Sequence, residues 1–251
     1  MIPKIIHYCW FGPLEKSEIA QRCITSWKEH CPDFEIKEWT ESNTQAYQNK
    51  FYENALRKKK YAFASDCIRV QALTQHGGVY FDTDMLLLKP ISEKLLSLDF
   101  FTGYEVDGRA AYGFFGAKKG HRFMLEMANF YRTSEFNEFS LPVITHTFKD
   151  LINDSTILEN ERIFAPEVFY PLSYQDRLND YRNHISDTTY AVHLWDHSWG
   201  RKEKKEGSLM NKLITVLNDY FFHGYSKQYF IRYFRGFSRQ LYHQQIGRSK
   251  K

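Results

Sequence analysis

The sequence predicts an α/β protein with a parallel sheet, followed by a basic helical extension. Within the first forty residues, an apolar β-type segment, a helical segment and a second β-type segment follow one another, which is the order of a βαβ unit. Residues 1–200 hold 22 Lys/Arg and 27 Asp/Glu, whereas residues 201–251 hold 12 and 3. We therefore expect one domain over residues 1–200 and a separate extension over residues 201–251.

The N-terminal elements follow from residue pattern. Residues 2–10 are mostly apolar, as in a strand buried on both faces. Ser17 is placed to cap a helix with apolar residues at positions 19, 23, 24 and 27, and Pro32 follows its end. Residues 34–39 come close to alternating apolar and polar side chains, which predicts a second strand.

Further elements are expected along the rest of the domain. A helix over residues 61–76 should stop at two consecutive glycines, 77 and 78, and a strand over 79–81 follows. Short strands are expected near 100–105 and 112–117, and helices near 121–131 and 141–151. Residues 163–190 are mixed in pattern, and we assign no element to them.

Composition limits the class of protein. Hydrophobic residues make up 43% and charged residues 25% of the chain, which is typical of soluble globular proteins. The four cysteines match neither a metal-binding CxxC pattern nor a disulfide framework, so we expect a reducing, cytoplasmic compartment. Residues 1–10 lack the features of a signal peptide, and no apolar run is long enough to span a bilayer.

Two aspartates, Asp82 and Asp84, interrupt an apolar run directly after the expected strand 79–81. Residues i and i+2 of a strand point to one side, and ligands bind at the carboxyl ends of strands in open α/β sheets. Both carboxylates are therefore candidates to hold one Mn²⁺ or Mg²⁺ ion that bridges a diphosphate. The alternative is an acidic turn between two strands.

Two other polar groups are candidates for the same site. Asp66 and Arg69 lie three residues apart on the expected helix 61–76 and share a face, so they are placed to bind sugar hydroxyls and phosphate, or to form an ordinary ion pair. The segment from His193 to Gly200 offers imidazole, hydroxyl and indole N–H groups. Its alternative is a core tryptophan cluster with a hydrogen-bonded histidine.

Four ordered motifs carry a family resemblance: IPKIIHYCWFG at residues 2–12, KYAFASD at 60–66, GGVYFDTD at 77–84, and His193 with Ser198-Trp199. Together they resemble glycosyltransferase family 32, the DXD-containing sugar transferases. That family includes fungal mannosyltransferases and many bacterial capsule-synthesis enzymes, and it is related to the clostridial glucosylating toxins. The resemblance covers about residues 1–200 and implies a GT-A fold, which is a Rossmann-like nucleotide-sugar-binding fold.

The resemblance also implies roles for binding the nucleotide-sugar donor. By position, Trp10 would stack on the nucleobase, and Asp66 and Arg69 would hold the ribose and the donor sugar. Ser198 and Trp199 would bind the diphosphate.

A Mn²⁺ or Mg²⁺ ion is implied as well, with Asp84 as the firmer ligand and Asp82 touching ribose, sugar or metal. For the third ligand, His193 is favoured over Asp196 and His197. Asp82, Asp84 and Arg69 are the expected catalytic residues.

The implied function is a metal-dependent, retaining transfer of a hexose, with a UDP-sugar favoured as donor. The implied acceptor is a lipid-linked glycan or a growing surface polysaccharide of the capsule type. One alternative is a protein that binds or hydrolyses sugar nucleotides without an acceptor. Another is a nucleic-acid-binding protein that uses the basic tail, although no nucleic-acid partner is expected.

The tail itself suggests a membrane contact. Residues 222–251 hold seven Lys/Arg and no acid. Apolar residues at positions 230, 233, 234, 237 and 241 follow helical spacing, with arginines at 232, 235 and 239 toward another side. Such a helix can lie on an anionic membrane, which predicts a peripheral protein on the inner face of the cell membrane. The alternatives are packing on residues 1–200 and binding of nucleic acid.

Overall fold

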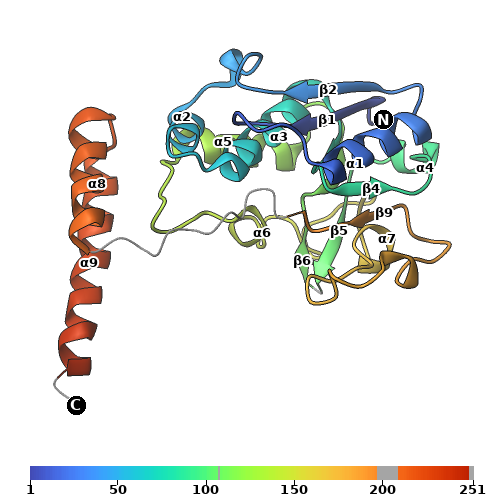
Figure 1. Cartoon of the computed structure of the whole chain (residues 1–251). Helices are drawn as coiled ribbons and strands as arrows, with labels where there is room; N and C mark the ends of the chain where they lie inside the picture. Colours follow the sequence, from blue (N-terminus) through green and yellow to red (C-terminus); the bar gives the residue numbers. More distant parts are fainter. Residues whose placement is uncertain (107, 197–208, 249–251) are drawn as a thin grey trace. The chain divides into compact units, whose positions relative to one another are not determined.

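The computed structural model describes residues 1–106, 108–196 and 209–248 (Figure 1). The chain divides into two compact units, residues 1–199 and 200–251. The strands of the first unit are β1 (Ile5–Cys9), β2 (Glu35–Trp39), β3 (Gly78–Phe81), β4 (Met85–Leu87), β5 (Phe100–Val106), β6 (Arg109–Ala110), β7 (Phe114–Ala117), β8 (Glu161–Phe164) and β9 (Ala191–His193). Its helices are α1 (Glu18–His30), α2 (Lys50–Arg57), α3 (Tyr61–His76), α4 (Glu93–Leu96), α5 (Arg122–Thr133), α6 (Ile144–Thr147) and α7 (Pro166–Phe169).

The central sheet is mixed, with the strand order β2-β1-β3-β7-β5-β6 and with β8 on β5. The initial βαβ unit is confirmed, because β1 pairs in parallel with both β2 and β3. Beyond β3 the sheet is mixed and not wholly parallel as expected, since β7 pairs antiparallel with β3 and with β5, whereas β8 pairs in parallel with β5. The link from β5 to β7 is too short for a parallel crossover, which needs a dozen or more residues.

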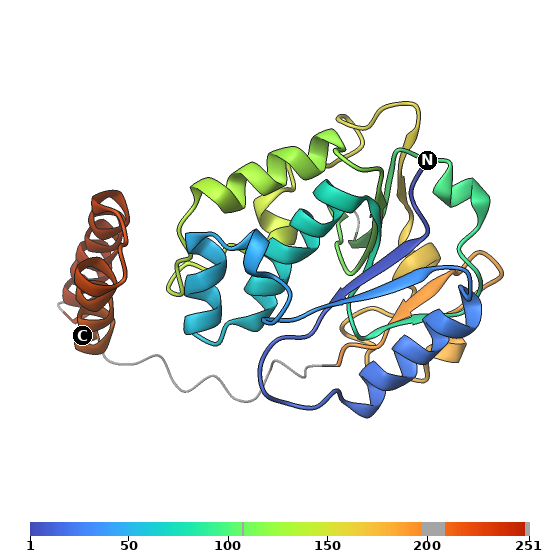
Figure 2. The same cartoon turned by 90° about the horizontal axis from the view of Figure 1, so that it is seen from above.

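The sheet separates two apolar cores, and strand alternation assigns each side chain to one of them. Tyr80 and Phe115 pack with α2, α3 and α5, whereas Phe81 and Phe114 pack with α1 and β4. Figure 2 shows the same division, with α2, α3 and α5 on one side of the sheet and α1 on the other. Side chains of strand β3 are therefore buried on both faces.

Local signals account for the helices that agree with prediction. Ser17 caps α1 by accepting a hydrogen bond from the N–H of Ala20. Helix α3 ends at Gly77, whose φ of 68° is a left-handed conformation that favours glycine. The helix expected over residues 141–151 is wrong in extent, because only α6 forms there. Its residues 143–147 are mostly β-branched, which lowers helix propensity. Helix α2 and strands β8 and β9 are elements that the pattern did not predict.

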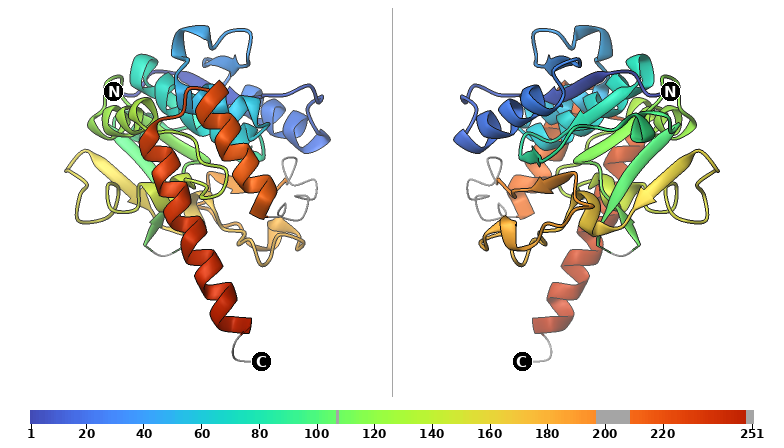
Figure 3. Two further views of the ribbon diagram at one scale, coloured as in Figure 1. Left: turned by 90° about the vertical axis from the view of Figure 1, so that its left-hand side faces the viewer. Right: turned by 90° about the vertical axis from the view of Figure 1, so that its right-hand side faces the viewer.

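The second unit is a helical hairpin of α8 (Leu209–Phe222) and α9 (Lys227–Arg248), which lie side by side (Figures 1 and 3). Val216 and Asp219 of α8 are buried, as are Tyr229 and Tyr233 of α9. The expected helical extension is therefore present as two helices. None of the described helices is long and apolar enough to cross a bilayer.

Candidate active site

The predicted site forms at one edge of the central sheet. Strands β1 and β3 are parallel and adjacent, with His7 opposite Tyr80, so both strands end at the same edge. Trp10 follows β1 and Asp82 follows β3. The aspartates occupy the tight turn between β3 and β4. The motif is therefore a turn between two strands, as in the alternative interpretation, and it also presents carboxylates at the edge of the sheet where ligands bind.

Arg69 joins two of the predicted acidic residues. Its Nη2 lies 3.0 Å from Asp82 Oδ1 and 3.2 Å from Asp66 Oδ1, and its Nη1 donates to the carbonyl of Tyr112 at 2.8 Å. The guanidinium also lies 4.5 Å from the centre of the Tyr80 ring. Because the Arg69 side chain is only 7% exposed, this is a buried network and not the exposed i,i+3 ion pair considered as the alternative.

Asp84 has a separate set of partners. His193 Nε2 donates to Asp84 Oδ2 at 3.1 Å, and the backbone N–H of Asp196 donates to the same oxygen at 3.0 Å. The Asp196 carboxylate in turn accepts from the Ser17 hydroxyl at 2.5 Å. Strand β9 brings these groups to Asp84, because it pairs antiparallel with β4 and places His193 opposite Met85.

Electrostatics distinguish the three carboxylates. Burial raises the pKa of Asp66 to about 7 in spite of the adjacent Arg69. Burial also raises the pKa of Asp82, although Arg69 opposes this effect, and the charge of Asp84 adds to it. For Asp84 the effect of burial is outweighed by the charge and hydrogen bond of His193, so its pKa is lowered. At neutral pH Asp84 is therefore the firmly ionised member of the pair.

A strained residue shapes the chain beside His193. Trp195 has a φ of 55°, which is uncommon for a bulky residue. Its Nε1 donates to the carbonyl of Leu172 at 2.9 Å, and its ring centre lies 3.9 Å from that of His193. The resulting turn brings the Asp196 N–H onto Asp84. Strain of this kind is concentrated at functional sites.

The donor set fits a divalent cation. Among the described residues no group of three or more His, Cys, Asp and Glu is gathered around a metal position. However, Mg²⁺ and ions like it are commonly held by one or two carboxylates together with water and substrate phosphates. Buried His193 Nδ1 has no hydrogen-bond partner in the described part of the chain. Nε2 is the nitrogen that faces Asp84, so a cation bound by both side chains would take the place of this hydrogen bond.

The remaining predicted residues are placed as follows. Trp10 is half-buried, its Nε1 donates to the carbonyl of Leu14 at 2.7 Å, and Lys16 Nζ lies 5.8 Å from its ring centre. Asp196, an alternative third ligand, is engaged by Ser17. The predicted residues His197, Ser198 and Trp199 lie outside the described residues.

Sequence reasoning missed two groups that line the Asp82 side chain. Gly113 accepts from the backbone N–H of Asp82 at 2.7 Å, and a Cβ at this position would lie 3.0 Å from Asp82 Oδ2. Tyr170 is buried, and its hydroxyl accepts from the N–H of Phe114 at 2.8 Å. A glycine inside a strand pattern can mark close approach, so Gly113 had a signal. Tyr170 had none, since only the fold brings it there.

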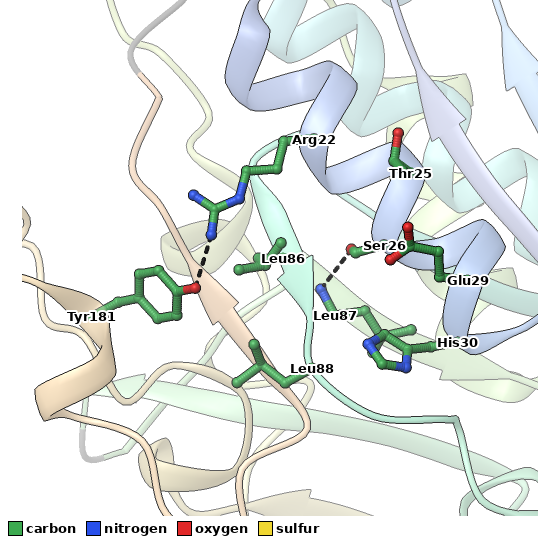
Figure 4. Close-up of a pocket in the computed structure, with 9 residues that line it drawn as sticks. All are labelled: Arg22, Thr25, Ser26, Glu29, His30, Leu86, Leu87, Leu88 and Tyr181. Atoms are coloured by element: carbon green, nitrogen blue, oxygen red, sulfur yellow. Dashed lines mark hydrogen bonds between the residues drawn. The ribbon is translucent and has the colours of Figure 1, made fainter.

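A pocket of about 390 Å³ lies beside α1 and β4, and Figure 4 shows its lining residues. Arg22 Nη2 donates to the Tyr181 hydroxyl across it at 2.8 Å. The lining consists of Arg22, Thr25, Ser26, Glu29, His30, Leu86, Leu87, Leu88 and Tyr181. None of the predicted site residues belongs to it, so this pocket is separate from the candidate active site.

The chain is similar to several known glycosyltransferases. Human alpha-1,4-N-acetylglucosaminyltransferase is 28% identical over 152 residues, covering 53% of this chain and 42% of that protein. The chain thus spans less than half the length of this relative. An uncharacterized glycosyltransferase of Acanthamoeba polyphaga mimivirus is 27% identical over 218 residues, covering 77% of this chain and 86% of that protein. The solved structure of the PaToxG glycosyltransferase is 20% identical, with a TM-score of 0.48, over 60% of this chain and 69% of that one.

Two family models match the chain. The alpha 1,4-glycosyltransferase conserved region matches residues 116–217, which include His193 and Asp196. The model described as capsular polysaccharide synthesis protein matches residues 1–159, which include Trp10, Asp66, Arg69 and both aspartates of the turn. The resemblance to DXD-containing sugar transferases is confirmed by these matches, and the chain belongs to the capsular polysaccharide synthesis protein family.

Proposed function

We propose that the protein is a glycosyltransferase that moves a hexose from a nucleotide-sugar donor, with retention of anomeric configuration, to a lipid-linked or growing surface polysaccharide. UDP-sugars are the favoured donors. The observation that carries the proposal is the convergence of two networks on one turn. Arg69 links Asp66 to Asp82, and His193 bonds to Asp84. These residues come from helix α3, the β3–β4 turn and strand β9.

Each residue then has a role that its environment supports. Arg69 is buried and fixes the Asp82 carboxylate by two hydrogen-bonding nitrogens. Asp66 accepts from hydroxyl groups of the ribose or donor sugar, and Trp10 stacks on the base at the end of β1. Ser198 and Trp199 are proposed to donate to the diphosphate.

Asp84 and Asp82 would hold Mn²⁺ or Mg²⁺, with His193 as the proposed third ligand. A divalent cation there would stabilise the negative charge that develops on the leaving nucleoside diphosphate. The lowered pKa of Asp84 keeps this carboxylate ionised at neutral pH, and the backbone N–H of Asp196 holds its orientation. No serine or cysteine nucleophile is required for this reaction, because the sugar is already activated by its diphosphate.

The first test is calorimetric titration of UDP and of GDP into the full chain, with and without Mn²⁺. We expect Mn²⁺-dependent binding of UDP and weaker binding of GDP. Binding of GDP alone would keep the proposed reaction and change the donor. Failure of the folded protein to bind either nucleotide would contradict the proposal.

A second measurement separates transfer from hydrolysis. Release of UDP from UDP-sugars is followed with and without polysaccharide or lipid-linked acceptors. Transfer predicts release that rises with acceptor, whereas a hydrolase would release UDP at a rate that acceptor does not change.

A further inference from the structure

The α8–α9 hairpin uses part of its predicted apolar stripe internally. Tyr233 and Tyr229 are buried, and so are Val216 and Asp219 of the facing helix. The Tyr229 hydroxyl lies 3.5 Å from Asp219 Oδ2. One residue of the stripe expected to face a membrane, Tyr233, therefore lies in the seam of the hairpin, and the apolar surface for a partner has to come from residues outside this seam.

Helix α8 supplies such a surface. Met210, Ile214 and Phe221 are 63%, 56% and 68% exposed. Their spacings of four and seven residues place them on one face of the helix. Phe222, at the end of the same helix, is 77% exposed. Large apolar side chains exposed together in this way mark an interaction surface.

The apolar face continues onto α9. Tyr220 of α8 lies beside Phe230, with ring centres 5.0 Å apart, and Phe230 lies beside Phe234 at 4.7 Å. Phe230, Phe234 and Phe237 are half-buried. Tyr220 also lies beside Phe221 of the exposed face, with ring centres 5.2 Å apart, so the half-buried rings of α9 adjoin that face.

The charged side chains exposed on the described part of the hairpin are positive. Arg232, Arg235 and Arg239 are exposed. Residues 209–248 contain a single acid, Asp219, and it is fully buried. The hairpin therefore presents positive charge together with an apolar face.

We propose that this face of the α8–α9 hairpin, formed by Met210, Ile214, Phe221 and the flanking aromatic rings, binds an anionic lipid bilayer. Arginines at a bilayer surface are attracted by anionic headgroups, while the apolar face enters the interface in the manner of an amphipathic helix. A second copy of the chain would bring like charges together, which opposes association through the same face. The proposal is independent of the reaction assigned to residues 1–200.

The test is flotation of the full chain with vesicles of phosphatidylcholine alone or mixed with phosphatidylglycerol. We expect binding only to the anionic vesicles and weaker binding at high salt. Ile214→Ser with Phe221→Ser should lower the apparent affinity at least tenfold. Changing Arg232, Arg235 and Arg239 to Gln should lower it by roughly a hundredfold. Gln228→Ser, at an exposed polar residue of α9, is the matched control and should bind like the wild type.

Circular dichroism of each variant shows whether the hairpin remains helical, and the arginine variant tests the proposal even if the serine variant unfolds. Absence of flotation would overturn the proposal, and so would binding that the serine variant leaves unchanged. A monomer–dimer equilibrium that shifts with the serine variant, without vesicle binding, would assign the face to a second copy. Nucleotide binding measured on the same samples separates these outcomes from those of the proposed function.

Discussion

Asp84 shows how one carboxylate can be held for binding without being neutralised by an arginine. One of its oxygens accepts from both His193 and the N–H of Asp196, and its side chain is 15% exposed. Asp82, two residues earlier, is paired with Arg69 instead. The two aspartates therefore differ in charge environment although they share a motif.

Asp84→Asn tests this difference. The amide keeps an oxygen for the hydrogen bonds but removes the charge, so we expect Mn²⁺-dependent UDP binding to weaken at least a hundredfold and transfer to be lost. The thermal midpoint should stay within a few degrees of wild type. Asp187→Asn, at an exposed aspartate, is the control in the same calorimetric titration. Turnover close to wild type in Asp84→Asn would contradict the metal role.

His7, in the motif at residues 2–12, has a structural role. It is fully buried, its Nε2–H donates to the carbonyl of Gly77 at 2.9 Å, and its Nδ1 accepts from Trp39 Nε1 at 3.1 Å. Nδ1 can accept the hydrogen bond from Trp39 only while it carries no proton, so the two bonds together require the neutral imidazole. Through these bonds His7 joins β1, β2 and the end of α3, which is a structural role within the motif at residues 2–12. Burial lowers the pKa of His7 to about 4.

This shift predicts acid sensitivity of the fold. Because the folded pKa of His7 lies below its ordinary value of 6.5, protonation favours the unfolded chain. Neutral His7 therefore contributes about 3 kcal/mol to the free energy of unfolding above about pH 6.5, and this contribution is lost as the pH falls toward 4. Urea unfolding at several pH values should show His7→Gln losing less stability over this interval than wild type. Equal losses in the two proteins would show that His7 is not the group responsible.

At the scale of elements, the N-terminus of α1 is coupled to the site. Ser17 accepts from the N–H of Ala20 as the helix cap and donates to Asp196, whose N–H holds Asp84. A helix cap is thus joined to a carboxylate of the candidate metal site through one intervening residue.

Two substitutions separate the cap from this link. Asp196→Ala keeps the cap and removes the link, so we expect weaker Mn²⁺-dependent UDP binding, by roughly tenfold. Ser17→Ala should show the same weakening and also lose about 1 kcal/mol of stability through the cap. Ser17→Thr retains both hydrogen-bonding functions and is the control. Calorimetry and urea unfolding of the three variants test this link. If Asp196→Ala bound UDP as tightly as wild type, Asp196 would not connect the helix cap to the site.

Two glycines at strand β7 have different neighbours: Gly113, directly before the strand, faces the candidate site, and Gly116, within it, faces the core. An added Cβ at Gly113 would meet Asp82 Oδ2 at 3.0 Å and the Tyr170 hydroxyl at 3.4 Å, whereas one at Gly116 would overlap the ring of Phe101 in the core. The first contact is with a side chain that is 31% exposed, and the second is with a fully buried ring.

We therefore expect Gly113→Ala to weaken nucleotide binding with little change in stability. Gly116→Ala should instead destabilise the fold by about 1–3 kcal/mol through overpacking. Thermal unfolding and UDP titration of both variants provide the comparison. If Gly113→Ala were the more destabilising of the two, the assignment of this glycine to the site would be wrong.

At the scale of the whole molecule, the two units have separate interiors. Among the residues that the structure describes, the buried side chains of the cores on the two faces of the sheet all lie between Ile2 and Ala191. The first unit is thus able to bury its own apolar surface, and the hairpin has its own seam.

Ending the chain after residue 208 should preserve Mn²⁺-dependent UDP binding within about threefold, because residues 1–208 retain every residue of the proposed donor site. The same protein should no longer float with anionic vesicles, if the hairpin provides that contact. A shortened chain that is folded but fails to bind UDP would show that α8 or α9 contributes to the site.

The local elements were predictable because their signals lie within a few residues. Ser17 and Pro32 bracket α1, the glycine pair ends α3, and an i,i+3 spacing pairs Asp66 with Arg69. All four cysteines are free and buried, as small apolar residues would be. These features depend on helix geometry and backbone conformation, which the sequence specifies directly.

The sequence by itself determined that two aspartates follow a buried strand at the edge where β1 also ends. Only the tertiary structure decided their partners. His193 and Asp196 lie more than a hundred residues from Asp84 and reach it through the pairing of β4 with β9. The antiparallel place of β7 likewise brings Gly113 to Asp82. Strand order and register depend on which apolar faces, distant in sequence, pack together, and a local residue pattern does not specify that pairing.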